Sequence, residues 1–193
     1  DNGSTDATLT ICRELSQGNQ RVDFISLEER GRGRALKRAW TESDATVVVY
    51  MDVDLSAGLD ALPQLVRAVA HDGYDIAIGS RLARGAHVIG RSPTREVISR
   101  TYNLLVRAMF RTKLLDLQCG FKALNLQTMR SVLSLVRDDI WFFDSEMLII
   151  AEKNGYRIRE VPVRWTDDPN SSVAIIPTAY GDLKGLLRLR LGG

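Results

Sequence analysis

Apolar and polar residues follow two rhythms along this chain, and together they predict an α/β fold. The charge-free, β-branched run at residues 47–51 is typical of a strand buried on both faces of a parallel sheet. A helix-like stretch follows it, and residues 74–80 form the next strand-like run. Strands and helices that alternate at this spacing build crossover units. We therefore expect a mostly parallel sheet flanked by helices.

The same two rhythms predict the remaining elements. Apolar residues at helical spacing predict helices at about residues 6–16, 35–42, 60–71, 94–110, 127–136, 145–153 and 178–191. Thr5 or Asp6 should cap the first of these helices, and Thr94 the long fourth one. Further strands are predicted at residues 21–27, 121–124 and 157–165. With 193 residues, 45% of them hydrophobic, the chain can bury one good core, so we expect a single domain over residues 1–193.

Basic residues are concentrated in one part of the chain. The net charge of +2 is too small to indicate nucleic-acid binding. Residues 81–113, however, carry eight basic side chains against one acidic side chain, with apolar residues at helical spacing among them. The tail at residues 178–191 also has a basic side and an apolar side. Such amphipathic helices lie at membrane interfaces or pack in a core, and we expect these two at an anionic membrane surface.

Cysteine, histidine and hydropathy patterns exclude several classes of protein. Cys12 and Cys119 are too few and too far apart for a disulfide framework, which favours a reducing compartment. His71 and His87 do not form a zinc-ligand pattern. No run of residues is long and apolar enough to cross a bilayer.

The strongest chemical signal is an acidic pair at the end of the first buried strand. Asp52 and Asp54 are separated by Val53, so both side chains lie on one side of an extended chain. Ligands of open α/β sheets bind beyond the carboxyl ends of such strands. Two carboxylates suit Mg²⁺ or Mn²⁺ that also takes diphosphate oxygens. In the alternative interpretation, Asp54 caps the next helix and Asp52 is a solvated strand end.

A second candidate for anion binding is the glycine-rich turn at residues 31–34. Arg32 and Arg34 alternate there with two glycines, directly before a predicted helix. Backbone N–H groups at a helix start bind phosphate, and a basic turn would assist them. A plain loop is the alternative explanation of the same residues.

Taken together, these segments resemble the family-two glycosyltransferases with a GT-A fold, and most closely their polyprenyl-phosphate (dolichol-phosphate-type) branch. The resemblance covers essentially the whole chain and depends on six stretches in a fixed order: residues 1–6, 31–36, 52–54, 79–81, 118–122 and 143–146. Each stretch is weak by itself, whereas their joint order is specific. The resemblance implies a Rossmann-like, mostly parallel sheet flanked by helices, with amphipathic helices at the membrane interface.

The resemblance also implies roles for particular residues. Mg²⁺ or Mn²⁺ would be held by Asp52, Asp54 and, more weakly, Ser56. The UDP- or GDP-sugar would contact Asp1, Asn2, Arg32, Arg34, Asp52 and Asp54. The acceptor phosphate would contact Arg81, Gln118 and Lys122, and the catalytic residues would be Asp54, Arg81, Asp144 and Glu146.

The chain departs from the family pattern in three places. The family's first strand has no counterpart, so we expect an N-terminally truncated catalytic domain whose tail, residues 178–193, leads toward membrane segments outside the chain. Asn2 stands where many relatives have Asp, which puts base recognition there in doubt. Ser56 stands where dolichol-phosphate mannose synthases often have Gln.

The resemblance implies an inverting, metal-dependent transferase that moves a sugar from a nucleotide diphosphate to a polyprenyl phosphate at the cytoplasmic face of the membrane. An ionised phosphate acceptor needs a cationic clamp, a role that fits Arg81 and Lys122. A sugar or small-molecule hydroxyl acceptor would instead need a carboxylate base, such as Asp144 or Glu146. Asp144 could also simply cap its helix. A nucleotide-sugar- or membrane-binding domain without turnover is the third possibility.

Overall fold

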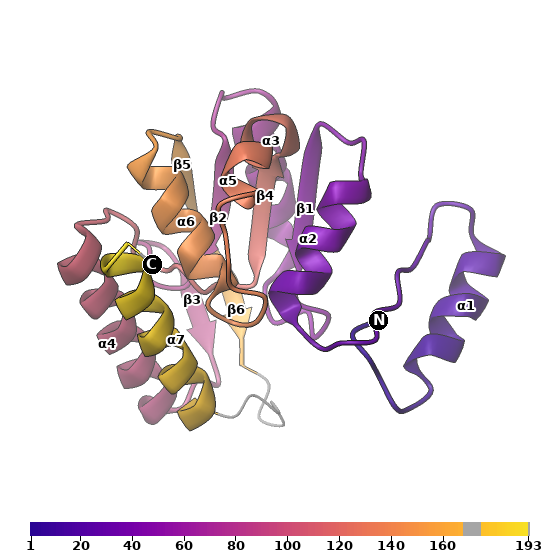
Figure 1. Cartoon of the computed structure of the whole chain (residues 1–193), viewed down its shortest axis with the longest axis horizontal. Coiled ribbons are helices and arrows are strands. Elements are labelled where there is room, and N and C mark those ends of the chain that lie inside the picture. The colour runs from indigo at the N-terminus through magenta and orange to yellow at the C-terminus, as the bar shows by residue number, and fades with distance from the viewer. Residues whose placement is uncertain (168–174, 193) are drawn as a thin grey trace.

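The computed structural model describes residues 1–167 and 175–192, and its centre is a four-stranded sheet with helices on both faces (Figure 1). The strand order is β1-β4-β2-β5, formed by β1 (Val47–Met51), β2 (Ile76–Ser80), β4 (Phe121–Asn125) and β5 (Ile158–Pro162). β2 and β5 are parallel, and β4 runs antiparallel between β1 and β2. Three of the four strands therefore point the same way. A second sheet pairs β3 (His87–Ile89) with β6 (Arg164–Thr166), and the predicted α/β fold is confirmed.

All seven predicted helices are present, with boundaries shifted by a few residues. They are α1 (Thr8–Gly18), α2 (Arg32–Glu42), α3 (Leu62–Ala70), α4 (Pro93–Phe110), α5 (Leu126–Leu133), α6 (Phe143–Lys153) and α7 (Ile175–Arg190). A 3₁₀ turn at Leu59–Ala61 leads into α3. Asp6, one of the two predicted caps, accepts the N–H of Thr8 at 3.0 Å. α1 has no buried residue and stands apart from the sheet (Figure 1).

The central sheet separates two layers of core, because alternate side chains of a strand point to opposite faces. Ile76, Ile78 and Leu124 pack in the layer that contains α2, α5 and α6. Ala77 and Ala123 pack on the other face, against α3. β2 is buried along its whole length, and α6 buries every residue of its first two and a half turns, from Phe143 to Ala151. These two elements form a rigid base for the polar residues described below.

Three strand predictions need correction. The run at residues 21–27 forms no strand. Among the described residues, its backbone hydrogen bonds to another segment join Ile25 and Leu27 to Asp1 only, and two such bonds are too few to form a sheet. The predicted strand at residues 157–165 is divided between β5 and β6, which belong to different sheets. The prediction that residues 47–51 are buried on both faces is also wrong. Only Tyr50 of β1 is buried, because β1 lies at the edge of the described sheet.

Two helix caps also differ from expectation. Ser92, rather than Thr94, caps α4 by accepting a backbone N–H of the first turn at 3.3 Å. At α6 the carboxylate of Asp138 accepts the N–H of Phe143 at 3.1 Å. Asp144 is therefore not the cap, and its side chain is free to turn into the protein.

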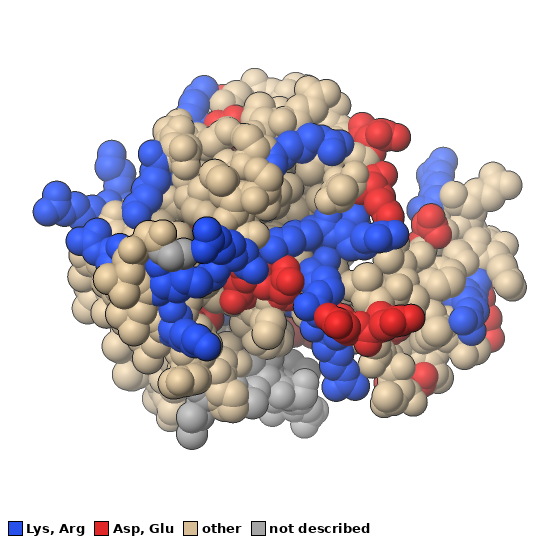
Figure 2. Space-filling model, viewed as in Figure 1, with Lys and Arg blue, Asp and Glu red and all other residues tan. Residues whose placement is uncertain are grey.

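α4 and α7 lie side by side along one flank of the molecule (Figure 1). Both expose large apolar side chains on this flank, namely Val97, Ile98, Leu104, Leu105, Tyr180, Leu183 and Leu187. Basic side chains gather over the same flank and continue across α2 (Figure 2). Within residues 1–167 and 175–192, no helix is long and apolar enough to cross a membrane.

Candidate active site

The acidic pair lies on a tight turn that follows β1. The backbone N–H of Asp52 donates to the carbonyl of Gly120 at 2.9 Å, which joins this turn to the segment before β4. Leu55 takes a left-handed conformation with φ of 54°, and Asp54 accepts the N–H of Ser56 at 2.9 Å. These contacts hold both carboxylates at the edge of the sheet, where the sequence predicts them.

Gly120 is needed where it stands because of the Asp52 carboxylate. A Cβ atom built on Gly120 would lie 1.7 Å from Asp52 Oδ2, far inside contact distance. A side chain at position 120 would therefore push the carboxylate out of its place. The motif at residues 118–122 thus serves the acidic pair directly, by leaving room for it.

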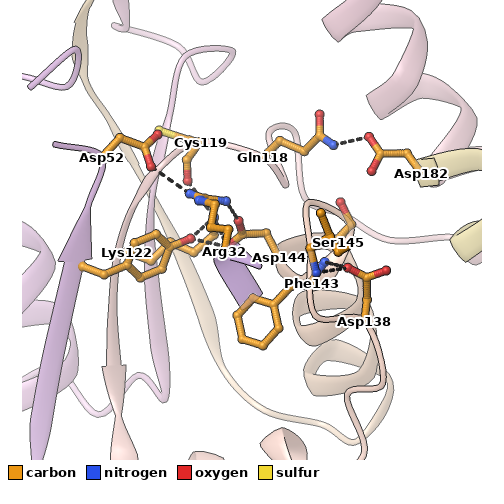
Figure 3. Close-up of polar contacts among 12 residues, drawn as sticks. Arg32, Asp52, Gln118, Cys119, Lys122, Asp138, Phe143, Asp144, Ser145 and Asp182 are labelled. Atoms are coloured by element: carbon orange, nitrogen blue, oxygen red, sulfur yellow. Dashed lines mark hydrogen bonds and ion pairs between the residues drawn. The ribbon is translucent and has the colours of Figure 1, made fainter. Parts of the chain in front are cut away.

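A buried network of charges lies behind the acidic pair (Figure 3). Arg32, from the first turn of α2, donates to Asp52 at 3.0 Å and also to Asp144. Asp144 is fully buried and accepts a further hydrogen bond from the hydroxyl of Tyr50. Burial by itself would raise the pKa of Asp144, but the adjacent Arg32 and Lys122 outweigh it and lower that pKa below its ordinary value. Asp144 is therefore an ionised partner of two cations.

Lys122 belongs to the same network and does not face open space. Its side chain is fully buried, and its ammonium donates to Tyr50 Oη at 2.9 Å and to the carbonyl of Cys119 at 2.6 Å. Asp144 Oδ1 lies 2.9 Å from the same nitrogen. An ammonium has three N–H donors, and these partners use all of them. Lys122 therefore orients Asp144 and Tyr50, which differs from the predicted contact with an acceptor phosphate.

A cavity of about 270 Å³ opens beside this network, at the end of the central sheet. The acidic pair and Arg32 line it from the side of β1 and α2. Other parts of the lining come from the residue that follows β2, from the start of α4 and the residues before it, and from α7; they include Arg81, Arg91, Arg95 and Asp182. Carboxylates that could hold a metal thus face a group of arginines across one cavity.

Arg81 is held firmly in the cavity wall. Its Nε and Nη2 donate to the two oxygens of Asp116 at 2.7 and 2.8 Å, and its guanidinium lies 4.9 Å from the ring centre of Trp165. Asp116 is fully buried; burial would raise its pKa, but Arg81 beside it lowers that pKa below the ordinary value. This bidentate ion pair fixes the guanidinium of Arg81. Its remaining N–H groups are not used by Asp116, and Arg81 lines the cavity.

Arg91 and Arg95, near the start of α4, extend the cationic wall. Arg95 donates to Asp167 at 3.3 Å. The side chain of Arg91 is only 9% exposed, yet its Nε and Nη1 have no hydrogen-bond partner among the described residues. Glu96 Oε2 lies 3.4 Å from Arg91 Nε, but not in hydrogen-bond geometry. Burial and the neighbouring Arg81 lower the pKa of Arg91. A buried guanidinium with unused donors is a site for an anion.

Glu146 and Gln118 are engaged inside the protein. Glu146 is buried and accepts the backbone N–H groups of Arg137 and Asp138 at 3.1 and 2.7 Å and the guanidinium of Arg188 at 3.0 Å. It joins α6 to α7 and does not line the cavity, so the predicted catalytic role is not supported by its position. Gln118 does line the cavity, where its side-chain N–H donates to Asp182 at 2.6 Å.

The residues predicted to bind the nucleotide lie in two places. Arg32, Asp52 and Asp54 line the cavity, whereas Asp1, Asn2 and Arg34 do not. The Asn2 side chain accepts the N–H of Gly31 at 2.8 Å and so fixes the glycine-rich turn.

Arg34 and Ser56 are also engaged away from the cavity. Arg34 donates to the carbonyl of Arg30 and pairs with Glu29 at 3.1 Å, so its guanidinium is in use elsewhere. Ser56 is buried, and its backbone joins this turn to β6 through Thr166 at 2.8 Å. Its hydroxyl does not line the cavity, so the predicted metal contact is not supported by its position.

The donor set of the acidic turn fits a hard divalent ion. Asp52 keeps Oδ2 beyond its contact with Arg32, and Asp54 keeps Oδ2 beyond its contact with Ser56. Mg²⁺ and Mn²⁺ take one or two protein carboxylates and complete their coordination with phosphate oxygens and water. The described residues contain no group of three or more Asp, Glu, His or Cys side chains placed for a metal, so substrate oxygens would complete the coordination.

The sequence pattern of the family described as "Glycosyl transferase family 2" matches residues 1–133 of the chain. The chain belongs to this family. Its N-terminal part therefore has the family pattern from the glycine-rich turn through the acidic pair to α5, which includes most of the cavity described above.

Two relatives match most of the chain. The chain is 36% identical over 189 residues to glycosyltransferase AglD of Haloferax volcanii, a match that covers 97% of this chain and 30% of AglD. It is 31% identical over 182 residues to the dolichyl-phosphate beta-glucosyltransferase of Drosophila melanogaster, covering 89% of this chain and 55% of that protein. The chain thus spans about a third to a half of the length of these relatives.

Solved structures of another glycosyltransferase share the fold. Glucosyl-3-phosphoglycerate synthase of Mycobacterium tuberculosis, in complex with Mn²⁺ and UDP-glucose, matches all of this chain and 66% of its own with a TM-score of 0.68 and 17% identity. The same enzyme in complex with phosphoglyceric acid gives a TM-score of 0.69 at 17% identity. At this identity the likeness shows the fold alone, which is the GT-A fold implied by the sequence.

Several residues of this family 2 site were not predicted individually. Arg91 and Arg95 belong to the basic stretch at residues 81–113, and nothing in the sequence distinguishes them from the exposed Arg100. Tyr50 lies in a run of apolar strand residues, although its hydroxyl bonds to Asp144. Asp182 lies in the amphipathic tail. Its only signal in the sequence is that it is the single acidic residue among the apolar and basic residues at 178–191.

Proposed function

We propose that the chain is the catalytic part of an inverting glycosyltransferase that moves a sugar from a UDP-sugar to a polyprenyl phosphate. The observation that carries this proposal is the cavity itself, with a two-carboxylate turn on one side and the unused donors of buried Arg91 on the other. The names of three relatives, all dolichyl-phosphate beta-glucosyltransferases, favour the same acceptor class. Mn²⁺ and UDP-glucose in a solved structure of the same fold favour UDP over GDP.

The acidic turn would bind the diphosphate of the donor through the divalent ion. When bound, Mg²⁺ or Mn²⁺ neutralises the charge that grows on the leaving diphosphate. Asp52 and Asp54 would hold it with their free oxygens, and Gly120 keeps the space that Asp52 needs. Arg32 presents a guanidinium beside Asp52, and Asp144, which is itself held by Lys122, fixes the position of Arg32. The resulting positive field acts where negative charge develops.

The arginine wall would bind the phosphate of the acceptor. A lipid monophosphate is largely ionised near neutral pH, with a second pKa of about 6, so its oxygen can attack without losing a proton to the protein. Arg81 is fixed by Asp116, and Arg91 has buried donors with no other described partner. Two guanidinium groups in such positions bind and orient a phosphate.

The buried carboxylates argue against a hydroxyl acceptor. Such an acceptor needs a base within reach, yet neither predicted base lines the cavity. Asp144 is ionised and held by Arg32, Tyr50 and Lys122, while Glu146 is held by Arg188 and two backbone N–H groups. With their hydrogen-bonding capacity used and a lowered pKa at Asp144, these groups are poor proton acceptors.

The flank formed by α4 and α7 would rest on the membrane that carries the acceptor. Exposed apolar residues on both helices lie among basic side chains such as Arg100, Arg107, Lys184 and Arg190. Each basic residue near an anionic leaflet contributes about 1 kcal/mol. Because the same two helices line the cavity, a lipid phosphate held there could reach the arginine wall. The cytoplasmic leaflet, where UDP-sugars are available, is the side that this function requires.

A matched pair of arginine variants tests the acceptor assignment. Arg91→Gln should raise the KM for a short polyprenyl phosphate by roughly 10- to 100-fold, the effect of losing a charge-assisted contact. The KM for UDP-glucose should change little, since the donor binds on the other side. Arg100→Gln serves as control, because Arg100 lies on the same helix but is exposed and paired with Glu96.

Transfer rates measured with Mn²⁺ saturating decide the outcome. Equal effects of Arg91→Gln and Arg100→Gln would contradict a phosphate site at Arg91. Transfer to a sugar hydroxyl, with none to polyprenyl phosphate, would replace the proposal with the hydroxyl-acceptor alternative. Binding of UDP-glucose with no transfer to any acceptor would favour a binding domain without turnover.

A further inference from the structure

Asp182 is a carboxylate of α7 that lines the cavity. It is only 4% exposed, and its Oδ2 accepts the hydrogen bond from Gln118. Its Oδ1 is buried and has no hydrogen-bond partner among the described residues. The residue lines the cavity, so a molecule that binds against this carboxylate would meet an oxygen that has no hydrogen-bond partner among the described residues.

The surroundings of Asp182 make its charge costly to the folded protein. Burial, against the opposing effect of the hydrogen bond from Gln118 and with the help of the nearby Asp138 and Asp144, raises the pKa of Asp182 to about 6. Tyr102 of α4 also lines the cavity, but its hydroxyl bonds to Ser145 at 2.7 Å and is not directed to Asp182. A buried carboxylate with a raised pKa that lines a cavity is a candidate for a functional residue, because its function would offset the loss of stability.

The position of Asp182 indicates which part of a substrate it would meet. In Figure 3 Asp182 lies on the far side of the polar cluster from Asp52, with Gln118 beside it. The proposed diphosphate site is at Asp52 and Asp54, and the proposed acceptor site is at Arg81 and Arg91. Neither phosphate is a partner for a carboxylate, because like charges repel. The transferred sugar, which lies between the two phosphates, supplies hydroxyl groups instead.

We propose that Asp182 is a specificity-determining residue whose Oδ1 accepts a hydrogen bond from a hydroxyl group of the donor's sugar. This inference rests on the proposed function, since it takes the ligand to be a nucleotide sugar. An ionised acceptor forms a strong bond with a hydroxyl, and a site built for that bond discriminates against a sugar that lacks it. Gln118 fixes the carboxylate, so α7 contributes to sugar selection as well as to the flank.

The test compares UDP with UDP-glucose in binding to the wild type and to Asp182→Asn, by calorimetry with Mn²⁺ present. The variant should bind UDP-glucose roughly 10- to 100-fold more weakly, as expected for a lost charge-assisted hydrogen bond. Binding of UDP should change by less than about twofold, because UDP has the ribose and the phosphates but no transferred sugar. UDP-glucose analogues that each lack one hydroxyl identify the partner. For one of them, wild type and variant should bind equally.

A stability measurement separates this role from a structural one. Removal of the charge should raise the melting temperature at pH 8 and change it less at pH 5, where Asp182 is protonated in the folded protein. Asp44→Asn, at an exposed position before β1, is the matched control and should change neither property. A lower melting temperature at pH 8 would indicate that Asp182 only anchors α7 and would overturn the inference.

The remaining outcomes are also decisive. An equal loss of UDP and UDP-glucose binding would assign Asp182 to the nucleotide, and unchanged binding with a large fall in kcat would make it a base; both overturn the inference. If the wild type shows no metal-dependent UDP binding, the proposed function fails and this inference fails with it. Binding of UDP with no additional effect of the sugar overturns this inference alone.

Discussion

The polar residues of this site fall into two regions that differ in how their charges are satisfied. The inner region, Arg32, Tyr50, Lys122 and Asp144, joins α2, β1, β4 and α6, and nearly every donor and acceptor has a partner inside the protein. The cavity wall keeps unused groups, at Arg91 and Asp182 above all. Buried charge alone therefore does not mark a ligand site. Unused hydrogen-bonding capacity facing a cavity does.

The pKa values of two carboxylates express the same contrast. Burial acts on both Asp144 and Asp182 in the upward direction, but Arg32 and Lys122 reverse it at Asp144 only. Asp144 therefore stabilises the folded protein when ionised, whereas ionised Asp182 destabilises it. Substitutions in the inner region should reduce stability, and substitutions in the wall should reduce ligand binding.

The largest expected effect is on the acidic turn, which belongs to the wall. Asp54→Asn should weaken Mn²⁺-dependent UDP binding by more than about 100-fold, because loss of a direct ligand exceeds the 10- to 100-fold effect of an outer-shell change. Stability should stay close to that of the wild type. Calorimetry with and without Mn²⁺ measures the first effect and urea unfolding the second. Unchanged Mn²⁺-dependent affinity in both Asp52→Asn and Asp54→Asn would remove the metal assignment.

The next largest effect should be on stability, in the inner region. Lys122→Met removes one partner of a buried ion pair and should lower the free energy of unfolding by about 3–5 kcal/mol. Urea denaturation measures this loss. Lys184→Met, at an exposed position of α7, is the control and should stay within about 0.5 kcal/mol of the wild type. A loss of less than about 1 kcal/mol for Lys122→Met would mean that the network is not coupled to folding.

A smaller effect with a distinct pH dependence is expected at Asp144. Its pKa is lowered in the folded protein, so its ionised form stabilises the fold above the ordinary value of 3.8, and this contribution is lost as pH falls below that value. Asp144→Asn should therefore cost about 2 kcal/mol at pH 7, and the difference from the wild type should narrow below about pH 4. Unfolding measured between pH 3 and pH 8 checks this, and a constant difference would contradict the assignment.

The smallest effect should come from Gly120→Ala. The added methyl group displaces the end of the Asp52 side chain, which can swing away at little cost to the fold. Metal-dependent UDP binding should fall by about 10-fold, as for other misplaced ligands. Gly181→Ala, whose Cβ would meet nothing within 4 Å, is the control. If the two variants bind UDP with equal affinity, the close approach of Gly120 to Asp52 has no role in the site.

The helices, the central strands and the acidic turn are predictable from the sequence, because they depend on local periodicity and on the residues at strand ends. The sequence also pointed to the family, since six short stretches occur in one order. It did not determine the pairing of strands. Residues 21–27 have strand composition but no adequate partner, and β4 enters between β1 and β2 from a distant part of the chain.

Which charged residues line the cavity depends on tertiary packing. Lys122 and Asp144 look in sequence like a phosphate clamp and a base, but α6 and β4 bring them together and each satisfies the other. Arg91 and Asp182 look like surface residues of amphipathic helices, yet the packing of α4 and α7 buries them beside the cavity. Burial and pairing are long-range properties, which the local order of residues does not contain.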